Sequence, residues 1–213
     1  MAAVLSAVFR FRESQLVFQV KWGQGTSGAL SEKRFTGEEE FKVDSKGRVS
    51  IPAKFRAVLE SQDSEYAPGK TARMYAVFGG HLDNHVECYS AETMSETVEM
   101  ILRLPQSKPR TKLMRRWYIS QSTEFAIDDT GRIVLPAKLR EKIGVGAGET
   151  VLFAGVGKTF QIWRPEAYEA MVEEQEALLD DEDEDFDPEA LLDDLRAEAQ
   201  ARPHLSLVPS SED

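Results

Sequence analysis

Cysteine is almost absent from the 213-residue sequence, because Cys88 is the only one. An intrachain disulfide is therefore excluded, and nothing in the sequence indicates an oxidising compartment. No apolar run approaches the roughly 18 residues that a membrane-spanning helix needs. The apolar start, Met1 to Phe9, has no basic residue before it and no clear cleavage pattern. We therefore expect a cytoplasmic protein with no membrane segment.

The sequence also lacks the common fingerprints of catalysis and nucleotide binding: it has no nucleophile elbow, phosphate loop or dinucleotide motif. The nearest approach to a metal site is the set His81, His85 and Cys88, whose spacing resembles that of zinc ligands. These residues fall in a glycine-led loop and a strand, and the second half of the chain has no matching set. We therefore predict no metal ion, no cofactor and no enzymatic activity, with Cys88 buried and both histidines exposed.

Acidic residues outnumber basic ones overall, so the formal net charge is -11. The charge is unevenly distributed. From Glu166 to the end there are 18 acidic and 2 basic residues, whereas the preceding part has 24 basic and 19 acidic residues. A mildly basic body favours an anionic partner such as nucleic acid, and the acidic tail is a separate element.

A thirteen-residue segment occurs twice, and this repeat organises the chain. DSKGRVSIPAKFR, from Asp44 to Arg56, returns 84 residues later as DDTGRIVLPAKLR, from Asp128 to Arg140, with seven identical positions. In each copy an aspartate and a glycine supply a turn between two strands, and a proline then begins a helix. Two more strands and a longer helix follow. The pattern predicts an α+β protein made of two tandem units with peripheral helices.

The remaining elements follow from periodicity and turn residues. We predict strands over Arg73–Phe78, Val86–Tyr89, Thr150–Phe153 and Thr159–Trp163, with Gly155 and Gly157 as turns, and helices over Ala91–Leu104, Arg110–Tyr118 and Pro165–Leu179. Ser90 is the expected N-cap of the first of these helices. The predicted domains are 34–109 and 110–179. Residues 1–33 are either a disordered extension or a stretch upstream of a true start near Leu30, and 180–213 form an acidic disordered tail in which 190–201 could be a short helix.

Each unit is too small to bury a stable core alone. The two units are therefore expected to pack as an intrachain pseudo-dimer, which sets the two turns in related places. The turn motif of the first copy contains Asp44 and Gly47, and that of the second contains Asp128 and Gly131.

The arginine after each turn, Arg48 or Arg132, suits the paired acceptors of guanine in the major groove of DNA. Basic residues nearby could neutralise phosphates: Lys46, Lys54, Arg56, Lys138 and Arg140. Two plainer interpretations stay open. The aspartate and arginine of each motif could form salt bridges that only brace a turn, and Arg56 and Arg140 could be solvated charges on their helices.

The doubled motif, together with FTGEEEF before its first copy, closely resembles the MraZ family of bacterial transcriptional regulators, over about Arg34 to Leu179. The resemblance implies two tandem SpoVT-AbrB-type swapped-hairpin domains. It also implies a ring-shaped homo-oligomer that represses the division and cell wall gene cluster, its own promoter included, at short G-rich direct repeats, in association with the nucleoid. The DNA-reading arginines then fall on Arg48, with Lys46 beside it, and on Arg132, where Thr130 replaces the lysine. The rival interpretation is an antitoxin-like interaction module, because related single-copy domains serve in antitoxins.

Overall fold

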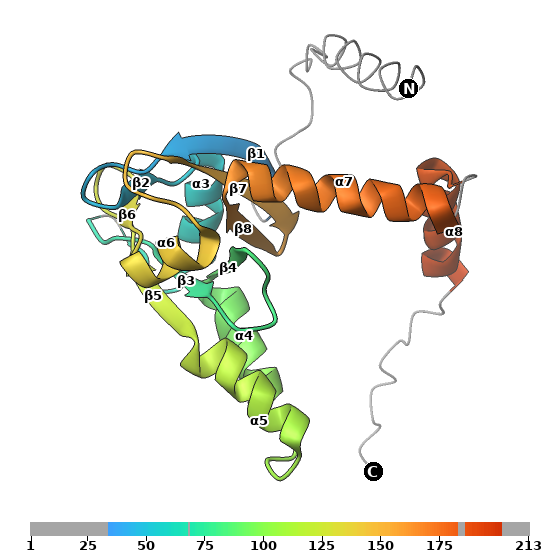
Figure 1. The fold of residues 1–213 in the computed structure, drawn as a ribbon. Helices are drawn as coiled ribbons and strands as arrows, with labels where there is room; N and C mark the ends of the chain where they lie inside the picture. The colour runs from blue at the N-terminus through green and yellow to red at the C-terminus, as the bar shows by residue number, and fades with distance from the viewer. Residues whose placement is uncertain (1–33, 68, 183–185, 202–213) are drawn as a thin grey trace, which may run out of the picture. The chain divides into compact units, whose positions relative to one another are not determined.

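The computed structural model describes residues 34–67, 69–182 and 186–201 (Figure 1). The chain forms two compact units, one that ends at Pro165 and one that begins at Glu166. The expectations for residues 1–33 and for the end of the tail, 202–213, lie outside the described residues.

Both sequence repeats contain the same series of two strands, a helix and two further strands. The first repeat contains β1 (Phe35–Lys42), β2 (Arg48–Ser50), α3 (Ala53–Ser61), β3 (Arg73–Val77), β4 (His85–Ser90) and α4 (Ala91–Leu102). The second contains β5 (Ser122–Ala126), β6 (Arg132–Val134), α6 (Ala137–Ile143), β7 (Thr150–Gly157) and β8 (Thr159–Trp163). The repeats are joined by α5 (Pro109–Arg115), which continues as the short π-helical segment η1 (Arg116–Ser120). This order agrees with the predicted order of strands and helices.

The strands of the two repeats interleave in one antiparallel sheet. Its order, β1-β7-β8-β4-β3-β5, reads as a palindrome when equivalent strands of the two repeats are matched. In a second sheet β2 pairs with β6 around Val49 and Ile133, two equivalent positions of the repeat. The predicted α+β pseudo-dimer is therefore correct. The expected boundary near residue 109 separates the repeats along the sequence, but both pack into one unit.

The core of this unit is shared between the repeats. Phe35 and Phe55 from the first repeat pack against Phe160 from the second, with ring centroids 4.9 Å and 5.0 Å from that of Phe160. All three rings are at most 1% exposed. Aromatic rings at such separations stabilise a core beyond the area they bury. Neither repeat has a complete core without the other.

Two predicted boundaries need correction. The helix expected over Ala91–Leu104 ends at Leu102, although Ser90 is its N-cap as predicted and accepts a hydrogen bond from the Thr93 amide. Gly155 is not a turn but lies inside β7, opposite Gly37 of β1. A Cβ atom at Gly155 would lie 2.5 Å from main-chain atoms of Phe35 and Thr36, so this glycine permits a close approach of two backbones.

In the described residues, the second unit contains two acidic helices, α7 (Pro165–Glu182), which begins at the last residue of the first unit, and α8 (Pro188–Ala201). The tail that was expected to be disordered from residue 180 contains α8, which covers the stretch 190–201 where a short helix was allowed for, and which begins at a proline suited to a helical first turn. Its leucines Leu191, Leu192 and Leu195 are about half exposed. Within the described ranges, no helix is both long enough and apolar enough to cross a bilayer.

Candidate nucleic-acid interface

The two predicted DNA-reading arginines share the outer face of the ribbon formed by β2 and β6. Figure 1 shows this ribbon at one edge of the first unit. In its register Arg48 lies opposite Val134, and Ser50 lies opposite Arg132. Side chains alternate between the faces of a strand, so these four residues point to one side. The central pair, Val49 and Ile133, points to the other side and is buried. Arg48 and Arg132 are two register positions apart, which is roughly 7 Å along the ribbon.

Each arginine is braced by the aspartate of its own motif. Asp44 accepts hydrogen bonds from the main-chain amides of Lys46 at 2.8 Å and Arg48 at 2.9 Å, and from Arg48 Nε at 2.6 Å. These bonds lower the pKa of Asp44 to about 2, with the Arg48 amide as the largest cause. The carboxylate therefore stays ionised at neutral pH.

The second loop repeats this arrangement with one difference. Asp128 accepts from the amide and Nε of Arg132, at 3.0 Å and 3.2 Å, and also from the amide and hydroxyl of Thr130. The Thr130 hydroxyl bond is the largest cause of the lowered pKa of Asp128. The threonine that replaces Lys46 in the second copy thus turns inward to its aspartate, and the second loop carries less positive charge.

The salt bridges between the aspartate and arginine of each motif, which the sequence allowed as an alternative, are present. They are compatible with a role in binding. Each bridge uses the Nε of its arginine. The terminal guanidinium nitrogens of Arg48 and Arg132 make no hydrogen bond to another residue in the described part of the chain. Both side chains are 34% exposed. A hydrogen bond at Nε leaves the two terminal nitrogens available to a ligand. It also fixes the direction in which they point before the ligand binds.

The glycines of the motif allow each loop to form main-chain hydrogen bonds with the other repeat. Gly47 and Gly131 have φ angles of +78° and +76°, which residues with a side chain rarely adopt. The Gly131 carbonyl accepts from the Ile51 amide at 2.9 Å, and the Gly47 carbonyl accepts from the Leu135 amide at 2.8 Å. Each loop is therefore tied to the opposite strand of the ribbon.

Two of the predicted phosphate-binding arginines support the loops from inside. Arg56 Nη1 donates to the Ile51 carbonyl at 2.8 Å, and the side chain passes over Gly131 of the other repeat. Arg140 Nε donates to the Leu135 carbonyl at 3.2 Å and lies against Gly47. Both are half-buried, so the interpretation as solvated helix charges is wrong for them.

The three predicted lysines are exposed, with different surroundings. Lys46 lies in the first loop, next to the ribbon. Lys54, at the start of α3, has its ammonium 3.9 Å from a carboxylate oxygen of Glu39. Lys138, at the start of α6, lies over the ring of Phe78 with its ammonium 4.5 Å from the centroid. Lys46 thus lies close to Arg48 in the chain. Lys54 and Lys138 lie on the helices that follow β2 and β6.

Sequence reasoning missed Ser50 and Val134, which complete the outer face of the ribbon. Val134 is 57% exposed, although it lies in a paired strand. The signal was available, because the same alternation that puts Val49 and Ile133 inside puts their neighbours outside. Only the pairing of β2 with β6, which the sequence alone does not give, sets each of these residues opposite the arginine of the other repeat.

The histidine and cysteine set is dispersed. Cys88 is buried in β4, as predicted. Both histidines were expected to be exposed, but both are half-buried. His81 packs against Trp117 and Tyr118, with ring centroids 4.8 Å and 5.0 Å away. His85 stacks on Trp163 at 4.2 Å, and burial lowers the pKa of both histidines. In the described part of the chain, no group of three or more His, Cys, Asp or Glu side chains is placed to hold a metal ion.

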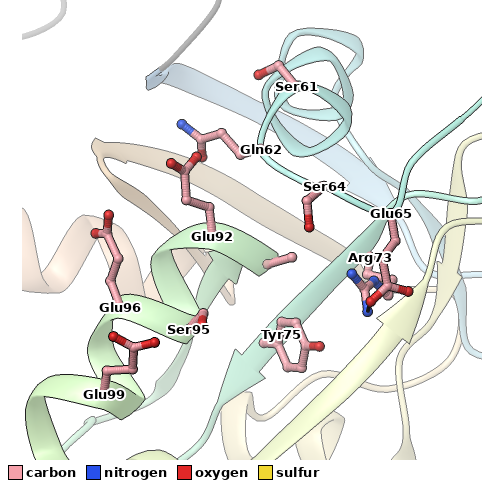
Figure 2. A pocket seen from close by; sticks show the side chains of 11 residues that line it. Ser61, Gln62, Ser64, Glu65, Arg73, Tyr75, Glu92, Ser95, Glu96 and Glu99 are labelled. Carbon is pink, nitrogen blue, oxygen red and sulfur yellow. Dashed lines mark ion pairs between the residues drawn. The ribbon is translucent and has the colours of Figure 1, made fainter.

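A cleft of about 640 Å³ lies away from the ribbon, between the end of α3, β3 and α4 (Figure 2). Its wall includes Glu65, Glu92, Glu96 and Glu99. The one guanidinium there, of Arg73, is already paired with Asp63 at 2.7 Å and Glu65 at 3.1 Å. Such a surface repels phosphate, so the cleft is no candidate for nucleic-acid binding.

Comparison with known proteins shows which family the chain is similar to. The family model described as "MraZ protein, putative antitoxin-like" matches residues 34–116 and 119–188, one segment for each repeat. A protein of Ruegeria sp. (strain TM1040) named "Transcriptional regulator MraZ" is 45% identical over 162 residues, which cover 76% of this chain and 96% of that protein. Proteins with the same name from Ruegeria pomeroyi and Rhodospirillum rubrum are 43% and 40% identical, over 76% and 65% of this chain and 96% and 84% of their own lengths.

Proposed function

The chain belongs to the MraZ family, and we propose that it is a transcriptional regulator that reads DNA with the outer face of its β2–β6 ribbon. The observation that carries the proposal is the pair of braced guanidinium groups, Arg48 and Arg132, on one exposed face. Each can donate two hydrogen bonds to O6 and N7 of a guanine. The name that the relatives carry, transcriptional regulator, supports the regulatory role.

The remaining basic residues have two kinds of role in this proposal. Lys46, Lys54 and Lys138 are exposed cations that neutralise phosphates and position the protein without reading sequence. Arg56 and Arg140 hold the loops of the opposite repeat and add positive charge behind them. No cofactor takes part, and the protein is not an enzyme.

We further propose that the protein represses the division and cell wall gene cluster by binding short G-rich direct repeats, including those in its own promoter. It would act in the cytoplasm, on the nucleoid, as a ring-shaped homo-oligomer. A ribbon with two reading arginines gives weak contact alone. Several protomers on one ring make the later contacts intramolecular, which raises affinity without new chemistry.

Binding should therefore depend steeply on the number of DNA repeats. We expect a duplex with three G-rich repeats to bind more tightly than one with two, and a duplex with a single repeat to bind weakly. The affinity should differ by at least about tenfold between the weakest and the tightest of the three duplexes. Fluorescence anisotropy at several salt concentrations measures this, and affinity should fall as salt rises because phosphate contacts release counterions. Equal affinity for all three duplexes would contradict binding by a ring.

An antitoxin-like function is the second candidate, because the matching family model carries that word in its description. The acidic α7 and α8, with exposed leucines on α8, could bind a basic partner protein. Purification from native cells distinguishes the two. A stoichiometric small basic protein would favour the antitoxin function, and bound promoter DNA would favour the regulator.

A further inference from the structure

The two halves of the ribbon are chemically different. In one half, Arg48 lies directly opposite Val134; in the other, Arg132 lies directly opposite Ser50. Ser50 and Val134 occupy equivalent positions of the repeat, so the pseudo-symmetry that relates the arginines breaks at their neighbours. One half carries an apolar group beside its guanidinium, and the other carries a hydroxyl.

We infer that Val134 contacts the C5 methyl group of a thymine next to the guanine that Arg48 reads, an inference that rests on the proposed function. Thymine is the one base of DNA that presents a methyl group in the major groove. Val134 is 57% exposed and turns its isopropyl group out on the same face as both arginines. Removing that group and a thymine methyl from water together stabilises a complex that contains both.

The spacing of the ribbon fits neighbouring base pairs. Residues that lie opposite each other in an antiparallel pair have Cα atoms about 4.5 to 5.5 Å apart. Successive base pairs of DNA are about 3.4 Å apart along the helix axis. An arginine side chain is longer than that of valine. Arg48 and Val134, which lie opposite each other, can therefore contact two adjacent base pairs, one pair each.

The other half of the ribbon is more permissive. Ser50 offers a hydroxyl that can donate or accept, so it contacts several bases without excluding one. Thr130, in the loop next to Arg132, is turned to Asp128 and adds no positive charge. The ribbon therefore reads a directional site, strict at the Arg48–Val134 half and tolerant at the Arg132–Ser50 half.

The test uses the full chain and a duplex that it selects from a random pool. Each thymine of the selected site is replaced in turn by deoxyuridine, which keeps base pairing and lacks the C5 methyl group. At one thymine beside an essential guanine, we expect the affinity of the unaltered protein to fall about fourfold, the contribution of a single buried methyl group. Val134→Ser should bind the thymine and deoxyuridine duplexes equally.

Matched variants separate this inference from the proposed function. Ser50→Val should gain a thymine preference in the opposite half of the site, and unchanged circular dichroism and oligomer size establish that both variants fold. If the unaltered protein tolerates deoxyuridine at every thymine, the assignment of Val134 is wrong, while the loss of binding in Arg48→Ala would still uphold the proposed function. If Arg48→Ala binds as well as the unaltered protein, the proposed function itself fails.

Discussion

Replacing Arg48 by alanine is expected to abolish specific DNA binding and leave the fold intact. The guanidinium is on the surface of the ribbon, and its internal contacts are with Asp44 of its own loop. A bidentate arginine–guanine contact discriminates by about 1 to 3 kcal/mol, and each protomer of a ring loses it at once. We therefore expect at least a hundredfold loss on a multi-repeat duplex, measured by anisotropy, with unchanged circular dichroism and oligomer size.

Two matched variants identify which property of Arg48 matters. Arg48→Lys keeps the positive charge but loses the planar fork, so it should retain salt-dependent binding to any DNA and lose the preference for G-rich repeats. Arg132→Ala should cost less than Arg48→Ala, because Thr130 and Ser50 make the second half of the ribbon less basic and less selective. Equal binding by Arg48→Ala and the unaltered protein would leave the ribbon without a reading role.

The turn motif was predictable from sequence because its chemistry is local. Asp44, Gly47 and Arg48 lie within five residues, and the positive φ of the glycine and the aspartate-to-amide bonds follow from residue type. The duplication also predicted the pseudo-dimer. The sequence could not show which repeat supplies the neighbour of each strand. Equivalent strands of the two repeats are similar in sequence, so either could pair at a given position, and tertiary packing determines which one does.

That exchange between repeats explains the missed features. Arg56 belongs to the first repeat but packs over Gly131 of the second, so its own helix gave no sign that it supports a loop. Gly155 resembles a turn residue in isolation, yet its role is set by Phe35, which lies 120 positions earlier in the chain. Ser50 and Val134 likewise gained meaning only from the pairing of β2 with β6.

The second large effect concerns stability and a residue outside the repeat motif. Asp63, in the loop between α3 and β3, has a side chain only 1% exposed. It accepts bonds from Arg73 Nη2 at 2.7 Å, from Arg73 Nε at 3.1 Å, and from the main-chain amides of Arg73 and Glu65, both at 3.0 Å. One carboxylate thus holds the loop and the first residue of β3.

Asp63→Ala should lower the free energy of unfolding by about 3 to 5 kcal/mol, because it leaves a partly buried guanidinium and two amides without their acceptor. Urea unfolding followed by tryptophan fluorescence measures the loss. Glu65→Ala is the matched control: Glu65 also pairs with Arg73, but it is 69% exposed, so its removal should cost less than about 1 kcal/mol. Similar losses in both variants would mean that burial of Asp63 contributes nothing special.

Acid should weaken the same contact in a defined range of pH. The hydrogen bonds from Arg73 lower the pKa of Asp63 to about 2, against about 3.9 for an unfolded chain. A lowered folded-state pKa means that the unfolded chain binds the proton first, so this contribution is complete above about pH 4 and is lost as the pH falls towards 2. Asp63→Asn cannot titrate, so its stability should change less than that of the unaltered protein over this interval. Parallel profiles for the two proteins between pH 4 and 2 would show that Asp63 is not the group whose protonation loosens the fold.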